Sequence, residues 1–120
     1  MGKILKISSN IQSFDKTISA EHCLITPGFI DSHTHPIFVN NRANEFKMRV
    51  SGISYKEIAE AGGGIISSIN GVRNSSEDEL YEATLENIET IFTHGSTTIE
   101  AKSGYGLTLE DELKSLRVLN

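Results

Sequence analysis

The apolar and polar positions divide the chain into short strand-like segments followed by longer segments with helical spacing. Three short apolar runs come first: residues 3–7, 17–19 and 22–25. Such runs are typical of small strands, which need a sheet to join. After the break at Pro27-Gly28, residues 29–35 begin apolar and become polar. We predict a strand here that ends at Pro36, because proline cannot donate to a ladder.

Helical signals begin further along the chain. Residues 40–48 are polar and mixed, which predicts a loop with a helical turn. Ser54 and Glu57 have the spacing of a capping box and predict a short helix from Tyr55 to Ala61. The three glycines at 62–64 should end this helix and allow backbone conformations that other residues resist.

The second half alternates helix, strand and helix. Ser76, followed by three acidic residues, predicts a helix that runs to His94. Residues 96–101 form a β-branched strand segment, and a glycine-rich loop follows at 102–106. Thr108 should cap a last helix, whose apolar face would be exposed in this chain and continues without an end signal: Leu109, Leu113 and Leu116.

The order of these elements predicts an α/β fold with a parallel sheet and helices packed outside it. Two strand–helix units cannot close a sheet, and a (β/α)8 barrel of the TIM type needs eight strands and about 250 residues. We therefore expect residues 28–120 to be the first units of an incomplete barrel. Residues 1–27 would be part of a small β domain that precedes it.

Composition narrows the class of protein. Eleven basic and sixteen acidic residues give a net charge of −5, which argues against a broad nucleic-acid or anionic-membrane surface. No run approaches the roughly 20 apolar residues of a membrane span, and no leader sequence is evident. Cys23, the single cysteine, lies in an apolar run and predicts a buried thiol in a reducing compartment. We expect a cytoplasmic protein.

The most informative residues end the strand at 29–35. Alternate side chains of a strand share a face, so Asp31, His33 and His35 should point the same way. Two imidazoles on one face can bind one divalent ion, and strand ends are where such folds place their chemistry. A His-x-His pair is a weak signal alone, because two exposed histidines at a strand end have the same spacing.

The surrounding motif is more specific. Residues 26–35, TPGFIDSHTH, resemble the opening motif of the amidohydrolase superfamily, in which two histidines end the first barrel strand and hold a catalytic metal. Four further segments together resemble the imidazolonepropionase family within that superfamily: residues 41–46, 55–58, 61–65 and 97–107. The match covers most of residues 27–120, and KSGYGL at 102–107 is its most distinctive piece. Asn40, Asn41 and Pro36 depart from the family's usual residues.

The resemblance implies roles for several residues. His33 and His35 would be two ligands of one divalent metal ion, zinc or iron. Arg42 would bind the substrate's propionate carboxylate, which a planar guanidinium suits, and Tyr105 would hold the substrate through its hydroxyl. From the residues alone, a solvent-exposed Arg42 is the favoured interpretation, and Tyr105 could equally be a turn tyrosine packed on the surface.

Other polar residues have open roles. Tyr55 could reach the pocket or pack on the core. Lys102 shares a strand face with Glu100, so an ion pair is a simpler reading than a lysine that bridges metals. His22 is expected at the surface, and His94 at a helix C-terminus, where a cation suits the helix dipole.

The resemblance implies hydrolysis of the cyclic amide of 4-imidazolone-5-propanoate to N-formimidoyl-L-glutamate by a metal-activated water, in a protein that forms homodimers. The family's later metal ligands and general-base glutamate do not occur in this chain. We identify no general acid or base here, and we predict no turnover by the chain alone. The alternatives are another amidohydrolase, such as a deaminase or a different cyclic amidase, and a non-catalytic remnant.

Overall fold

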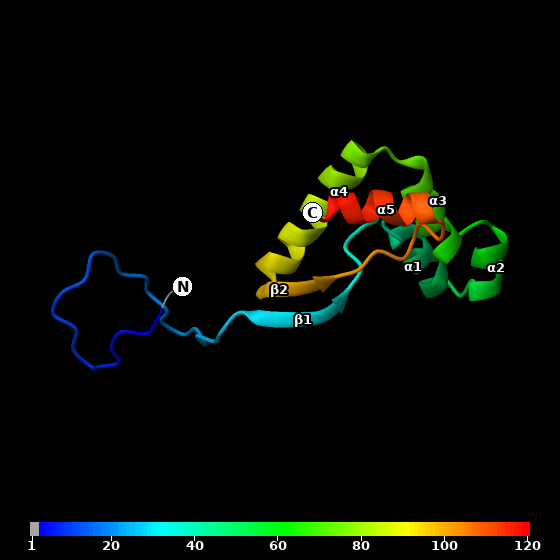
Figure 1. Ribbon diagram of the computed structural model, residues 1–120. Helices are drawn as coiled ribbons and strands as arrows, with labels where there is room; N and C mark the ends of the chain where they lie inside the picture. The colour runs from blue at the N-terminus through cyan, green and yellow to red at the C-terminus, as the bar shows by residue number, and fades with distance from the viewer. Residues whose placement is uncertain (1–2) are drawn as a thin grey trace.

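The computed structural model describes residues 3–120, which form two strands and five helices (Figure 1). In chain order these elements are β1 (Phe29–Thr34), α1 (Ala43–Val50), α2 (Tyr55–Glu60), α3 (Ile65–Asn74), α4 (Glu77–Thr93), β2 (Ser96–Ala101) and α5 (Leu109–Val118). No helix among these residues is long and apolar enough to cross a membrane.

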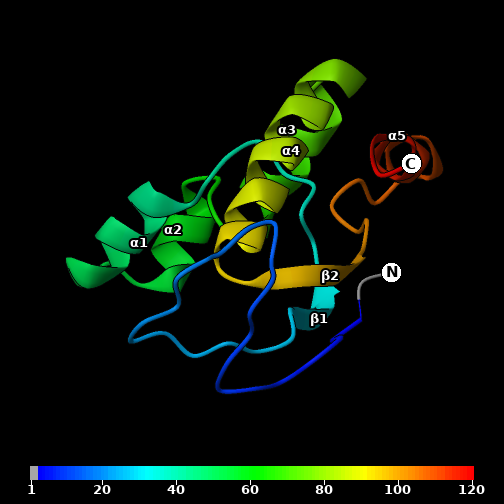
Figure 2. The ribbon, with the colours of Figure 1, turned by 90° about the vertical axis from the view of Figure 1, so that its left-hand side faces the viewer.

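The two strands pair in parallel, with Phe29 opposite Ser96 and Thr34 opposite Ala101. Parallel strands need a long crossover connection, which helices α1–α4 provide. Helix α4 descends obliquely to the start of β2 in both ribbon views (Figure 1 and Figure 2). The predicted strands at 29–35 and 96–101 are confirmed, although β1 ends one residue before His35.

Local capping fixes where the predicted helices begin. Ser54 with Glu57, and Ser76 with Glu79, form reciprocal capping boxes at the starts of α2 and α4. At α5, the Thr108 hydroxyl accepts a hydrogen bond from the backbone amide of Asp111. The predicted helix starts are therefore confirmed, since short-range side-chain bonds determine them.

Two helices differ from the prediction. Residues 43–50 form the full helix α1 rather than a loop with one helical turn. Helix α3 was not predicted, because its sequence IISSINGVRN contains serine, asparagine and glycine, which are weak helix formers. Burial stabilises it instead, through Ser68, Ile69, Gly71 and Val72.

The core lies between the crossover helices and the segment that follows β1. Ile37, Val72 and Leu80 form its buried centre, and four partly buried residues pack against it: Val39, Tyr105, Val118 and Leu119. Helix α5 buries Ser115 and leaves its leucines outside, with exposed fractions of 78% for Leu109, 45% for Leu113 and 48% for Leu116. The predicted exposure of this apolar face is confirmed.

The segment before β1 is different. Residues 3–28 form no strand, and their apolar side chains, including Leu5 and Leu24, are exposed, so the strands predicted at 3–7, 17–19 and 22–25 are wrong. Cys23 is also exposed, so the predicted buried thiol is wrong. Both errors have one cause: an apolar run becomes a buried strand only where a neighbouring strand accepts its hydrogen bonds. The small β domain predicted for residues 1–27 stays a prediction. Residues 1–2 of that range lie outside the part of the chain that the structure describes.

Candidate metal and substrate site

His33 and His35 lie where β1 ends. Their imidazole centroids are 5.2 Å apart, with the ring planes at 65°. The pairing of β1 with β2 becomes irregular between Asp31 and Thr34, and the His33 amide donates to Asp31 Oδ1 over 3.1 Å. The structure thus places the two predicted ligands side by side at the polar end of β1.

The histidine pair fits part of a metal site. His35 Nδ1 is buried and has no hydrogen-bond partner among the described residues. A buried polar atom without a hydrogen-bond partner destabilises the fold. Coordination of a metal ion such as zinc or iron would satisfy the lone pair of this nitrogen. Within residues 3–120, however, no cluster of three or more histidine, cysteine or acidic side chains could hold a metal. Catalytic zinc sites use three protein ligands, so these two need others from elsewhere.

Tyr105 approaches the same site from the loop after β2. Its ring centroid is 5.5 Å from that of His35, and the ring packs against the core. The preceding Gly104 has φ +138°, and a Cβ there would lie 3.1 Å from His35 Cε1. The glycine therefore permits the loop to lie close to the His35 ring.

Two charged side chains hold the loop that carries Tyr105. Glu112 Oε1 accepts a hydrogen bond from the Leu107 amide over 2.8 Å, and Arg73 Nε donates to the Gly106 carbonyl over 2.7 Å. Burial opposes ionisation of Glu112, but hydrogen bonds from Ser103 and from loop amides outweigh it and lower the pKa of this carboxyl. Neither Glu112 nor Arg73 was predicted as part of the site, because their contacts with the loop join separate elements.

Arg42 and Tyr105, far apart in sequence, line one hollow of about 300 Å³. Its other lining residues are Phe38, Asn40, Asn41 and Ser68. Asn40 and Asn41 are two of the positions that depart from the family's pattern. Ser68 was missed because helix α3 was not predicted. The arrangement places a cation and a phenol on one cavity, with His35 beside the phenol.

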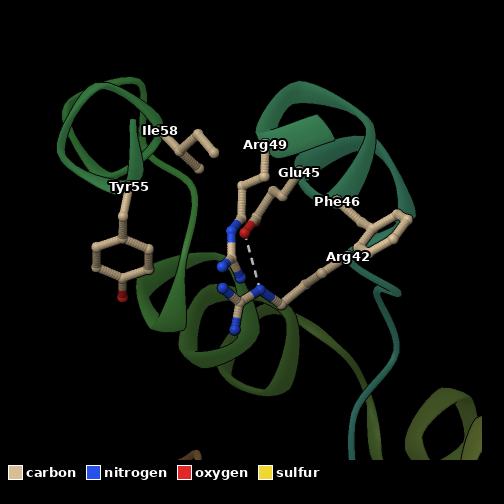
Figure 3. Close-up of a pocket in the computed structure, with 6 residues that line it drawn as sticks. All are labelled: Arg42, Glu45, Phe46, Arg49, Tyr55 and Ile58. Atoms are coloured by element: carbon tan, nitrogen blue, oxygen red, sulfur yellow. Dashed lines mark hydrogen bonds and ion pairs between the residues drawn. The ribbon is translucent and has the colours of Figure 1, made fainter. Parts of the chain in front are cut away.

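Arg42 also borders a second hollow of about 260 Å³ between α1 and α2 (Figure 3). Its Nε donates to Glu45 Oε2 over 2.8 Å, and the guanidinium groups of Arg42 and Arg49 point toward the same region. Tyr55 lines this hollow and is 57% exposed, so it does not pack in the core.

The remaining polar residues have structural partners. Glu100 and Lys102 form the expected ion pair. His94 caps the C-terminus of α4 with Nδ1 2.7 Å from the Thr90 carbonyl oxygen, and His22 is exposed. The simpler interpretations of these four residues are confirmed.

No protein-family model matches the chain. Several curated proteins do, and those cited here are named imidazolonepropionase. The protein of Aliivibrio fischeri is 57% identical over 85% of this chain and 25% of its own length. The protein of Psychromonas ingrahamii is 50% identical over 98% of this chain and 30% of its own length. The protein of Mesorhizobium japonicum is 52% identical over 85% of this chain and 25% of its own length. The chain thus spans about a quarter to three tenths of the length of these relatives.

Proposed function

We propose that the whole protein hydrolyses 4-imidazolone-5-propanoate to N-formimidoyl-L-glutamate, since the chain is homologous to part of proteins named imidazolonepropionase. One observation carries the proposal beyond the names of the relatives. Tyr105 lies between the two parts of the site: its ring is beside His35, which is beside His33, and it lines the same hollow as Arg42. That order suits a substrate with a ring amide at one end and a carboxylate at the other.

His33 and His35 would hold one divalent ion, zinc or iron, together with ligands from outside this chain. When bound, such an ion supplies Lewis-acid activation of water near neutral pH. The unpartnered, buried Nδ1 of His35 supports this assignment. For the whole protein we propose a barrel of the TIM type, a fold that repeats parallel strands joined by helical crossovers.

The chain's own residues would bind and orient the substrate. Arg42 would pair with the propionate, and the Tyr105 hydroxyl would hold the ring end close to His35. Fixing both ends places the ring carbonyl for attack by water, which breaks the cyclic C–N bond and leaves the new carboxylate and amidine on the product. Such positioning lowers the entropic part of the barrier. A cytoplasmic homodimer stays a prediction for the whole protein.

The decisive experiment compares the full reading frame around this sequence with the 120-residue chain. We expect the full-length protein, loaded with zinc or iron, to hydrolyse imidazolone propanoate. The chain alone should show no turnover, because two histidines leave a catalytic metal one protein ligand short. Turnover by the purified 120 residues would contradict this second expectation.

Assays with cytosine and dihydroorotate as substrates distinguish the proposed function from the alternative amidohydrolase activities. Activity of the full-length protein on either, without activity on imidazolone propanoate, would replace the proposed function by a deaminase or a different cyclic amidase. A reading frame that supplies no further ligands and shows no activity on any of the three would favour a non-catalytic remnant.

A further inference from the structure

Glu45 connects two parts of the candidate site. It lies in the first turn of α1, and its side chain is only 14% exposed. Its two carboxylate oxygens have different partners: Oε2 accepts from Arg42 Nε over 2.8 Å, and Oε1 accepts from the Gly64 amide over 3.0 Å. One carboxylate therefore joins Arg42 to the start of α3, the helix that brings Ser68 to the same hollow.

The triple glycine makes this contact possible. A Cβ at residue 63 would lie 3.2 Å from the carboxyl carbon of Glu45, and Gly64 has φ +74°. Side chains at these positions would push the turn away or strain it. The hydrogen bond from Arg42, helped by that from Gly64, outweighs burial and lowers the pKa of Glu45. The carboxylate is thus held from two sides.

This contact determines which donors Arg42 has left. A guanidinium has five N–H donors, and Nε carries one of them. With Nε bonded to Glu45, the two terminal nitrogens remain for a ligand. Together they can form a bidentate pair with a carboxylate, directed away from Glu45. Since the Arg42 side chain is 45% exposed, few other contacts would restrict its rotation.

We propose that Glu45 is a positioning residue for recognition of the substrate's carboxylate and that it acts through Arg42. This inference rests on the proposed function. Arg42 would supply the attraction, and Glu45 would fix the direction in which its terminal nitrogens point. The same bond couples that direction to the turn at residues 63–64.

The test uses the full-length, metal-loaded protein with two substrates: imidazolone propanoate and a 5-propyl imidazolone without the carboxylate. Glu45→Gln can accept only one of the two hydrogen bonds and carries no charge. We expect kcat/KM for the propanoate to fall about tenfold through KM, the equivalent of one charge-assisted hydrogen bond, with kcat nearly unchanged. Activity on the propyl compound should change less than about twofold.

Glu79→Gln is the matched control, because Glu79 occupies the same third helical position in α4, makes a capping box and does not contact Arg42. It should behave as wild type on both substrates. In an Arg42→Lys background, which lacks Nε, Glu45→Gln should add almost nothing, since the partner atom is gone.

Equal losses on both substrates, or an unchanged KM for the propanoate, would overturn the inference. Should Glu45→Gln fail to fold by circular dichroism, Glu45→Asp replaces it: the shortened carboxylate keeps its charge but cannot reach both donors, and the same selective rise in KM is expected. If wild type hydrolyses neither compound, the proposed function fails, which is distinct from a wild type that is active but insensitive to Glu45.

Discussion

At the scale of single residues, the buried Nδ1 of His35, which has no hydrogen-bond partner among the described residues, predicts a role in metal binding. In the full-length protein, His35→Ala should lower zinc affinity by at least about 100-fold, because removal of even an outer-shell partner commonly costs 10- to 100-fold. Titration against a fluorescent zinc chelator measures this directly. His94→Ala provides the control, since His94 only caps α4. An unchanged affinity in His35→Ala would remove this histidine from the metal site.

Single residues also show how far a sequence can predict a site. His33 and His35 could be identified because strand spacing and a local motif place them together. Glu45 could not be identified as a partner of Gly64, since their hydrogen bond joins residues 19 positions apart and depends on a helix that the pattern did not predict. Short-range patterns identify candidate ligands, whereas the groups that orient them come from tertiary contacts.

At the scale of elements, the start of α5 lies directly against the loop that carries Tyr105. A Cβ on Gly106 would lie 2.6 Å from Asp111 Cβ and 2.8 Å from the Glu112 nitrogen, and the backbone there cannot move aside. Gly106→Ala should therefore destabilise the full-length protein by about 1–3 kcal/mol, the usual range for overpacking, and should lower activity by displacing Tyr105. Urea unfolding with an activity assay tests both.

Gly52→Ala is the comparison for that experiment. Gly52 has φ +90° but no atom within 4 Å of an added Cβ. The Gly52→Ala variant should lose roughly 1–2 kcal/mol of stability, the cost of placing alanine in a left-handed backbone conformation, and should keep its activity. An equal loss of activity in both variants would show that the effect is general destabilisation rather than displacement of the loop.

The elements also differ in how predictable they are. Helices α2, α4 and α5 have caps made by neighbouring residues, and β1 and β2 have β-branched or apolar runs bounded by proline and glycine. These signals are local. Helix α3 forms because Val72 and Ile69 are buried, and the residues before β1 fail to form strands because no neighbour accepts their hydrogen bonds. Both of these outcomes depend on the rest of the fold.

At the scale of the whole molecule, several carboxylates with lowered pKa values cap helices, join elements or, in the case of Glu100, form a local ion pair: Glu45, Glu57, Glu79, Glu100, Asp111 and Glu112. A carboxyl whose pKa is lower in the folded state stabilises the fold fully above its unfolded pKa. That contribution is lost as the pH falls through the folded pKa. The free energy of unfolding should hence be level near neutrality and decline below about pH 4.

Denaturant unfolding at a series of pH values measures this decline. Glu79→Gln removes one of the contributing groups, so the variant should be less stable than wild type at pH 7 and should converge with it in acid. A constant difference at all pH values would mean that the ionisation of Glu79 does not contribute.

The parallel pairing of β1 with β2 has a consequence for the order of events during synthesis and folding. Each helix can form as soon as its own residues are available, but the partner of Phe29 is Ser96. Strand β1 must therefore wait, unpaired, until the ribosome has released residues 96–101. Closing so long a loop before any strand contact forms makes pairing the slow step. Refolding should accordingly show early helix formation followed by a later phase that reports on the sheet.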